Sequence, residues 1–263
     1  MASEDFRRHV RVPIPSAGSA PADRLTLKLN RKNSRRITRI DDAGAQDPPA
    51  TQLGFNAALA SDYRFRGLSQ SRLRPALQAG AELVHNPSGW YAGAWLSTIR
   101  WIDDAGGDTG LELDLYAGRR GTIGAFTYDA GVLAYVYPSS TLATSPNTRE
   151  VYLQGGYGPA WIKYSHAFSN LFGTPDSKHS GYLDIGANLP LRAGLVLNLH
   201  AGRQRVDGHG ALSYNDVRIG LTRSFGASSV SLAVVGTDTD AYAGPRGRNL
   251  GKTGLVLTAT TTF

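Results

Sequence analysis

From residue 51 onward, apolar residues alternate with polar or small ones almost without interruption. In 111–118, for example, Leu or Ala fills the odd positions, while the even positions hold Glu112, Asp114, Tyr116 and a glycine. Successive side chains of an extended chain point to opposite faces, so a period of two predicts strands rather than helices. We expect twelve strands, near 51–67, 73–85, 90–101, 110–118, 122–137, 148–157, 160–168, 181–188, 194–204, 214–223, 229–237 and 252–263.

The connections between these segments alternate in length. Tight turns are expected at 86–89, 119–121, 158–159, 189–193 and 224–228, and longer polar loops at 103–109, 138–147, 169–180, 206–213 and 238–251. The first connection, 68–72, belongs by its position to the long loops but is shorter than the others. Short turns on one rim and long loops on the other are typical of outer-membrane barrels with both termini at the short-turn side. We therefore predict an all-β fold, a closed antiparallel up-and-down transmembrane β-barrel of about twelve strands over residues 46–263.

The alternation also fits the two media that such a barrel meets. No 18-residue apolar window exists, so a membrane location requires a closed barrel, in which every backbone group is paired. An Arg or Lys facing lipid at mid-membrane costs about 2–4 kcal/mol, and the predicted outer face carries almost no charge. We expect aromatic girdles at the strand ends from Tyr63, Phe65, Tyr164 and Phe225. We interpret the C-terminal Phe263, in register with the lipid face, as a signal for the barrel-assembly machinery.

Residues 1–45 have a different character. They contain ten Lys or Arg and five Asp or Glu, a net charge of +5, whereas the rest of the chain holds 18 and 16, a net of +2. A folded nucleic-acid-binding body would need a basic face, which this balance does not support. The segment lacks the apolar core of a secretory signal. Its mixed charge and low hydrophobicity predict disorder. Two interpretations stay open: a misannotated gene start with the true signal elsewhere, or a basic arm that binds an anionic partner or a membrane surface.

Three stretches resemble a known family. They are 61–71 (Ser-Asp-Tyr-Arg-Phe-Arg-Gly-Leu-Ser-Gln-Ser), 75–80 (Pro-Ala-Leu-Gln-Ala-Gly) and 89–97 (Gly-Trp-Tyr-Ala-Gly-Ala-Trp-Leu-Ser). Together they resemble the TorF-type porins, the Gcw_chp group of proteobacterial outer-membrane proteins. The resemblance runs from about residue 51 to the end of the chain. It implies a signal peptide, an outer-membrane barrel and a role in solute passage, but no catalytic residues.

The inward face of the predicted strands carries most of the charge. The lumen-facing candidates are Asp62, Arg64, Arg66, Glu82, Glu112, Asp114, Asp129, Lys163, Asp184, His200, Asp216 and Arg218. One interpretation is a charged constriction that selects solutes by field and size. The other is a self-neutralising polar plug that only stabilises a narrow barrel. Acids outnumber bases seven to four in this set, which favours cations or neutral solutes.

The sequence contains few features that would indicate an enzyme. There is no cysteine, so thiolate nucleophiles and thiolate metal sites are excluded. The six histidines lack metal-ligand spacing, and only His200 has lumen parity. No Gly-x-Ser-x-Gly motif marks a nucleophile. We predict no catalytic, metal or cofactor site and no enzymatic activity.

The expected function is an outer-membrane channel for diffusion of small hydrophilic solutes. Its expected partners are outer-membrane lipid, lipopolysaccharide, the assembly machinery and the solute, without nucleic acid. Three alternatives remain: a plugged structural or adhesive barrel, a barrel-embedded lipid hydrolase, and a soluble lipocalin-like binding protein. The solute and the oligomeric state are not specified by the sequence.

Overall fold

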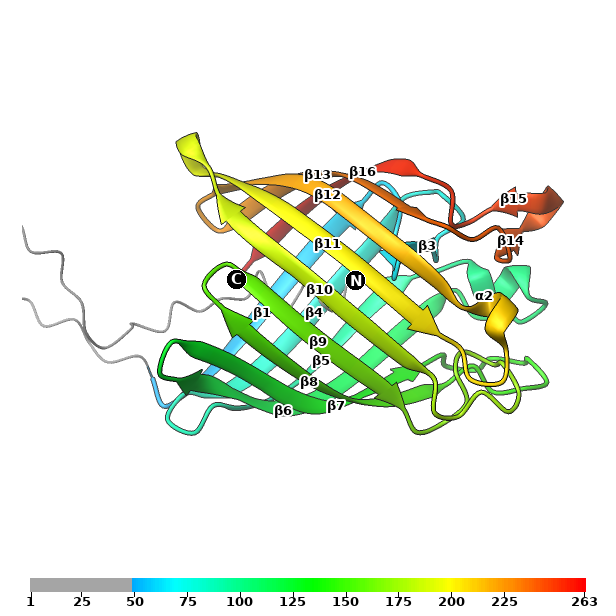
Figure 1. Cartoon of the computed structure of the whole chain (residues 1–263), viewed down its shortest axis with the longest axis horizontal. Coiled ribbons are helices and arrows are strands. Elements are labelled where there is room, and N and C mark those ends of the chain that lie inside the picture. Colours follow the sequence, from blue (N-terminus) through cyan, green and yellow to red (C-terminus); the bar gives the residue numbers. More distant parts are fainter. Residues whose placement is uncertain (1–48) are drawn as a thin grey trace, which may run out of the picture.

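Twelve strands form one closed antiparallel barrel in the computed structural model, which describes residues 49–263 (Figure 1). The predicted twelve-stranded barrel is confirmed, while the predicted leader, residues 1–45, lies outside the described residues. Around the barrel the strand order is β1-β16-β13-β12-β11-β10-β9-β8-β7-β6-β5-β4. The strands are β1 (Thr51–Ala60), β4 (Ala76–His85), β5 (Trp90–Thr98), β6 (Leu111–Ile123), β7 (Phe126–Val136), β8 (Thr148–Tyr157), β9 (Ala160–Ala167), β10 (Gly181–Pro190), β11 (Leu195–Arg205), β12 (Tyr214–Phe225), β13 (Ser228–Thr237) and β16 (Gly254–Thr262).

The barrel closes where its first strand meets its last. β1 pairs with β4 on one side and with β16 on the other, where Asn56 lies opposite Thr262 and Ala60 opposite Thr258. The Phe263 amide extends this seam by donating to the Phe55 carbonyl at 2.9 Å. Closure leaves no row of unpaired backbone groups, which hydrocarbon would not solvate.

The two faces of the strands have opposite chemistry. On β6, Leu115 faces outward with 47% of its surface exposed, whereas Asp114 and Tyr116 are buried inside the barrel. Outward leucines on other strands are more than 60% exposed, among them Leu77, Leu153 and Leu255. Monomeric soluble proteins rarely expose continuous apolar surface of this extent, so the outer face is suited to hydrocarbon.

Short turns lie at one rim of the barrel and long loops at the other (Figure 1). The turn predicted at 119–121 is wrong, because β6 continues to Ile123 and the turn consists of Gly124 and Ala125. Gly124 has a φ of +60°, the left-handed conformation that a two-residue hairpin turn requires. The arginines at 119 and 120 therefore continue the strand alternation.

The first long connection departs most from prediction. The strand expected over 51–67 ends at Ala60, and residues 61–75 fold back into the barrel as one inserted segment. This segment contains a small hairpin, β2 (Arg64–Phe65) and β3 (Leu68–Ser69), with positive φ at Arg66 and Gly67 between them. The expected short connection at 68–72 is therefore part of a 15-residue connection, the range 61–75 between β1 and β4.

Two of the four predicted girdle residues are misplaced for the same reason. Tyr63 and Phe65 belong to the inserted segment and are buried inside the barrel, where contacts with wall residues replace contact with lipid. Tyr164 on β9 and Phe225 on β12 face outward and are about half exposed. Only the latter pair occupies positions that an aromatic girdle can use.

The remaining long loops carry short elements. The strand expected to reach residue 101 ends at Thr98, and α2 (Trp101–Asp104) follows it. The last long loop forms the hairpin β14 (Ala243–Gly244) and β15 (Arg248–Asn249) around η3 (Pro245–Gly247). The short helices η1 (Arg192–Gly194) and η2 (Gly210–Leu212) flank β11. Among residues 49–263, no helix is long and apolar enough to cross a membrane.

Inward tyrosines lie along the wall, against glycines of neighbouring strands. A Cβ atom at Gly131 would lie 2.5 Å from both the Tyr152 hydroxyl and the Ala117 carbonyl oxygen. The Tyr91 hydroxyl occupies the equivalent place at Gly118. An aromatic ring that rests on a glycine takes up less of the lumen than one that projects across it.

We therefore expect Gly131→Ala to destabilise the barrel by about 1–3 kcal/mol, because the new methyl meets rigid backbone and overpacks the wall. The measurement is the free energy of unfolding from urea titration in lipid vesicles. Gly155→Ala on β8 is the matched control, since a Cβ there meets nothing within 4 Å. Equal stability of the two variants would contradict this account of the wall.

Candidate functional site: the charged lumen

The predicted lumen residues lie in two places. Asp62, Arg64 and Arg66 lie on the inserted segment rather than on a strand of the barrel wall. The alternation along the wall strands therefore does not explain their inward positions. The others lie on the wall: Glu82 on β4, Glu112 and Asp114 on β6, Asp129 on β7, Lys163 on β9, Asp184 on β10, His200 on β11, and Asp216 and Arg218 on β12. All twelve are buried except Asp129 and Arg218, which are half-buried.

Arg66 connects the inserted segment to the opposite wall. One guanidinium nitrogen donates to both carboxylate oxygens of Glu150 on β8, at 2.7 and 2.9 Å. Another donates to the side-chain oxygen of Gln204 on β11 at 2.8 Å. The guanidinium also lies 4.3 Å from the ring centre of Tyr182 on β10. Three strands therefore hold one cation, which fixes the segment across the lumen.

Asp62 and Arg64 organise the inserted segment itself. The Asp62 carboxylate accepts hydrogen bonds from the Arg64 Nε and from the hydroxyls of Ser69 and Ser71. Arg64 also donates to the carbonyls of Gly67, at 2.9 Å, and of Leu250 and Lys252, both at 3.1 Å. These bonds satisfy a buried ion pair and connect the first long connection to the last.

His200 lies between two carboxylates inside the lumen. Its Nδ1 is 2.9 Å from Asp184 and its Nε2 is 2.7 Å from Asp216. The Tyr182 hydroxyl donates to Asp216 at 2.9 Å, which links this group to the Tyr182 ring beneath Arg66. A serine hydrolase needs one imidazole nitrogen free to accept the serine proton. His200 has both nitrogens against carboxylates, so this arrangement does not serve that chemistry.

Sequence reasoning missed two lumen charges. Glu150 shares the parity of the inward residues on β8, and extending that alternation by two positions would have found it. Arg120 was assigned to a turn; it lies on β6, 2.7 Å from Glu82, with its guanidinium 4.7 Å from the Tyr91 ring centre. With both included, the lumen residues named from 49–263 comprise eight acids and five bases, so the acidic excess persists in this set.

Three further lumen charges have hydroxyl groups or aromatic rings among their contacts. Glu112 accepts hydrogen bonds from the Tyr63 and Tyr137 hydroxyls at 2.6 and 3.0 Å. The Lys163 ammonium lies 4.5 Å from the Tyr152 ring centre, and Arg218 donates to Ser231 at 3.2 Å. Within the described part of the chain, no group of three or more His, Asp or Glu residues could hold a metal ion.

Water reaches the lumen unevenly. Towards the short-turn rim, several inward polar side chains are half-buried, including Gln154, Asn188, Asn198, Thr258 and Thr260. Four others on that side are buried: Asn56, Glu82, Thr222 and Ser231. Towards the long-loop rim, the inward residues around Arg66 are buried. Solvent-accessible polar lining of the lumen is therefore found on the short-turn side rather than around Arg66.

A family model matches most of the sequence. The model of the family described as "Bacterial protein of unknown function (Gcw_chp)" matches residues 42–263. The chain belongs to the Gcw_chp family. A search of curated proteins found no match.

Two solved porin structures share the fold of this Gcw_chp protein. The NanC porin is 11% identical with a TM-score of 0.52, and the match covers 81% of this chain and 99% of that one. The KdgM porin is 7% identical with a TM-score of 0.50, over 81% and 98% of the two chains. An outer membrane channel from Pseudomonas putida F1 is 15% identical at a TM-score of 0.46, covering 86% and 100%. The first two place the fold among outer-membrane porin barrels.

Arg66 and Glu150 provide a test of how the inserted segment is held. Replacing either one by Ala leaves the other charge buried without its partner, so we expect each variant to lose about 3–5 kcal/mol of stability. The double variant should lose less than the sum of the two, because no charge is then stranded. Urea titration of vesicle-inserted protein measures all three.

The exposed pair Arg205–Asp207 is the matched control, with side chains 65% and 33% exposed. Arg205→Ala should change stability by less than about 1 kcal/mol. Strictly additive effects of the Arg66 and Glu150 substitutions would show that the two side chains are not coupled.

Proposed function

We propose that this protein is an outer-membrane channel through which small hydrophilic solutes diffuse along a polar lumen. The observation that supports this most is the half-exposed polar lining between the short-turn rim and the inserted segment. Polar side chains that water reaches are the lining that diffusion of hydrophilic solutes requires. The inserted segment then acts as the constriction, with charges of both signs around it.

The proposal includes an orientation and a location. In outer-membrane barrels the short turns face the periplasm and the long loops face outside, so solutes would reach the inserted segment first from the loop side. The match to Gcw_chp, together with the stretches described above, supports placing the protein with the TorF-type porins. Phe263, 78% exposed at the seam, is where we propose that the assembly machinery recognises the chain.

A plugged barrel with a structural or adhesive role is the second candidate. The observation that favours it is the Arg66 contact across the lumen, because a segment held by three strands obstructs the path. The two candidates differ in one measurable property, ion flow through the folded barrel.

We expect the purified barrel to conduct in planar lipid bilayers, with a reversal potential in a KCl gradient that indicates cation preference, because acids exceed bases in the lumen. The Arg66→Ala/Glu150→Ala double variant should conduct more, since the inserted segment loses its hold on the far wall. Arg205→Ala, on an exposed rim residue, should behave as the unmodified protein. Folded, inserted protein that passes no current in any variant would favour the plugged barrel.

A further inference from the structure

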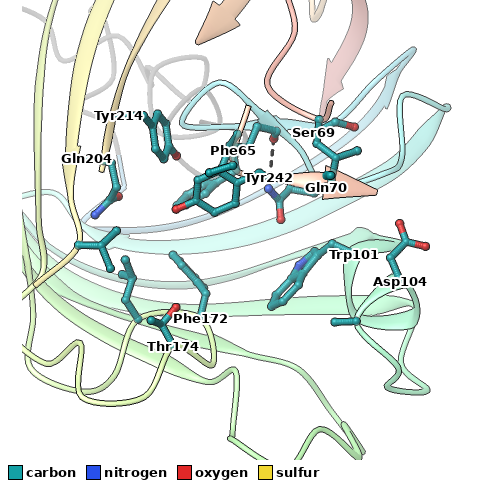
Figure 2. Close-up of a pocket in the computed structure, with 17 residues that line it drawn as sticks. Phe65, Ser69, Gln70, Trp101, Asp104, Phe172, Thr174, Gln204, Tyr214 and Tyr242 are labelled. Atoms are coloured by element: carbon teal, nitrogen blue, oxygen red, sulfur yellow. Dashed lines mark hydrogen bonds between the residues drawn. The ribbon is translucent and has the colours of Figure 1, made fainter. Parts of the chain in front are cut away.

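A cavity lies on the long-loop side of the inserted segment. Its volume is about 330 Å³, within the range of about 300–1,000 Å³ typical of small-molecule sites. Figure 2 shows its side chains on two sides of an open space, with Phe65, Tyr214, Tyr242 and Gln70 facing Trp101 and Phe172. These residues come from the inserted segment, three loops and the start of β12. The cavity is thus built from parts far apart in the sequence.

The lining combines aromatic rings with neutral polar groups. Its polar side chains are amides, hydroxyls and the indole N–H, together with a single carboxylate, that of Asp104. Arg72 neutralises this carboxylate, with its Nε 3.0 Å from an Asp104 oxygen. Burial raises the pKa of Tyr242 to about 12, and its hydroxyl donates to the Leu212 carbonyl at 2.7 Å. The cavity therefore offers no unpaired charge to a ligand.

Two polar side-chain atoms of the cavity lining lack hydrogen-bond partners among the described residues. The Trp101 Nε1 is buried and donates to no atom of residues 49–263. Gln70 donates to the Leu68 carbonyl at 3.1 Å, while its side-chain oxygen accepts no hydrogen bond from these residues. The backbone N–H groups of Arg100 and Trp101 both donate to the Gln70 carbonyl, which joins the backbones of the two cavity segments. A buried donor without an acceptor is costly, and Trp101 lines the cavity, so a ligand oxygen placed beside its indole would relieve that cost.

We propose that this cavity binds a neutral saccharide of one or two sugar units, with the Trp101 N–H and the Gln70 side-chain oxygen as its hydrogen-bonding groups. A sugar presents hydroxyls that both donate and accept, and a C–H face that packs on aromatic rings. An anionic or cationic ligand would lose its hydration and find no counter-charge in the cavity. The inference rests on the proposed function, since the cavity lies where a solute from the loop side first meets the constriction.

Isothermal titration calorimetry of the folded protein tests this site, in a detergent without a sugar headgroup. The probes are glucose, maltose and lactose, with gluconate as the charged comparator. We expect at least one neutral sugar to bind and gluconate to bind more weakly. Trp101→Phe, which keeps an aromatic ring but removes the N–H, should weaken binding by about tenfold. Trp90→Phe is the control, because Trp90 is 58% exposed at the opposite rim.

Heat-modifiable migration on SDS gels establishes that each variant is folded, and Gln70→Ala replaces Trp101→Phe if the latter does not fold. The proposed saccharide site would be overturned if no neutral sugar binds or if gluconate binds equally well. It would also be overturned if the folded variants bind as tightly as the unmodified protein. Planar-bilayer conductance separates this result from the proposed function. Sugar binding without conductance would contradict the channel alone, and conductance without binding would contradict the site alone.

Discussion

Pairing every backbone N–H and C=O within the sheet is the constraint from which the structure follows. Hydrocarbon offers these groups no substitute for water, so the strands must close on themselves, as they do where β1 meets β16. Once the sheet is closed, each strand has one face towards the outside and one towards the lumen. The twelve-strand closure therefore determines both the leucine-rich exterior and the space in which polar side chains can gather.

The inserted segment turns this space into a candidate functional site. Residues 61–75 bring one buried cation, Arg66, to a carboxylate, an amide and an aromatic ring on three different strands. Desolvating a guanidinium is costly, and only a nearly complete set of partners offsets that cost. The contacts that satisfy Arg66 thus also hold the inserted segment across the lumen, between the half-buried polar lining on the short-turn side and the aromatic cavity on the loop side.

Much of the fold was predictable because alternation depends on one local property, the face to which each side chain points. This is why all twelve barrel strands were found, most with ends within a few residues of the prediction. The inserted segment was not predictable in this way. Tyr63, Arg64, Phe65 and Arg66 also alternate, and only contacts with distant strands show that they fold inward. The alternation along β8 could have predicted that Glu150 faces inward. The partners of Arg66 and His200 could not be predicted, because they depend on which strands face each other across the barrel.

The central claim is that neighbouring residues of one strand meet hydrocarbon and water. Because the chain has no native cysteine, single cysteines at Leu257 and Thr258 on β16 test it directly. Leu257 is 50% exposed on the outer face, and the inward Thr258 is half-exposed in the lumen. In vesicle-inserted protein, a charged, membrane-impermeant thiol reagent should label the cysteine at position 258 and leave that at 257 unmodified. Equal labelling of both positions, or labelling of 257 alone, would contradict the barrel as described.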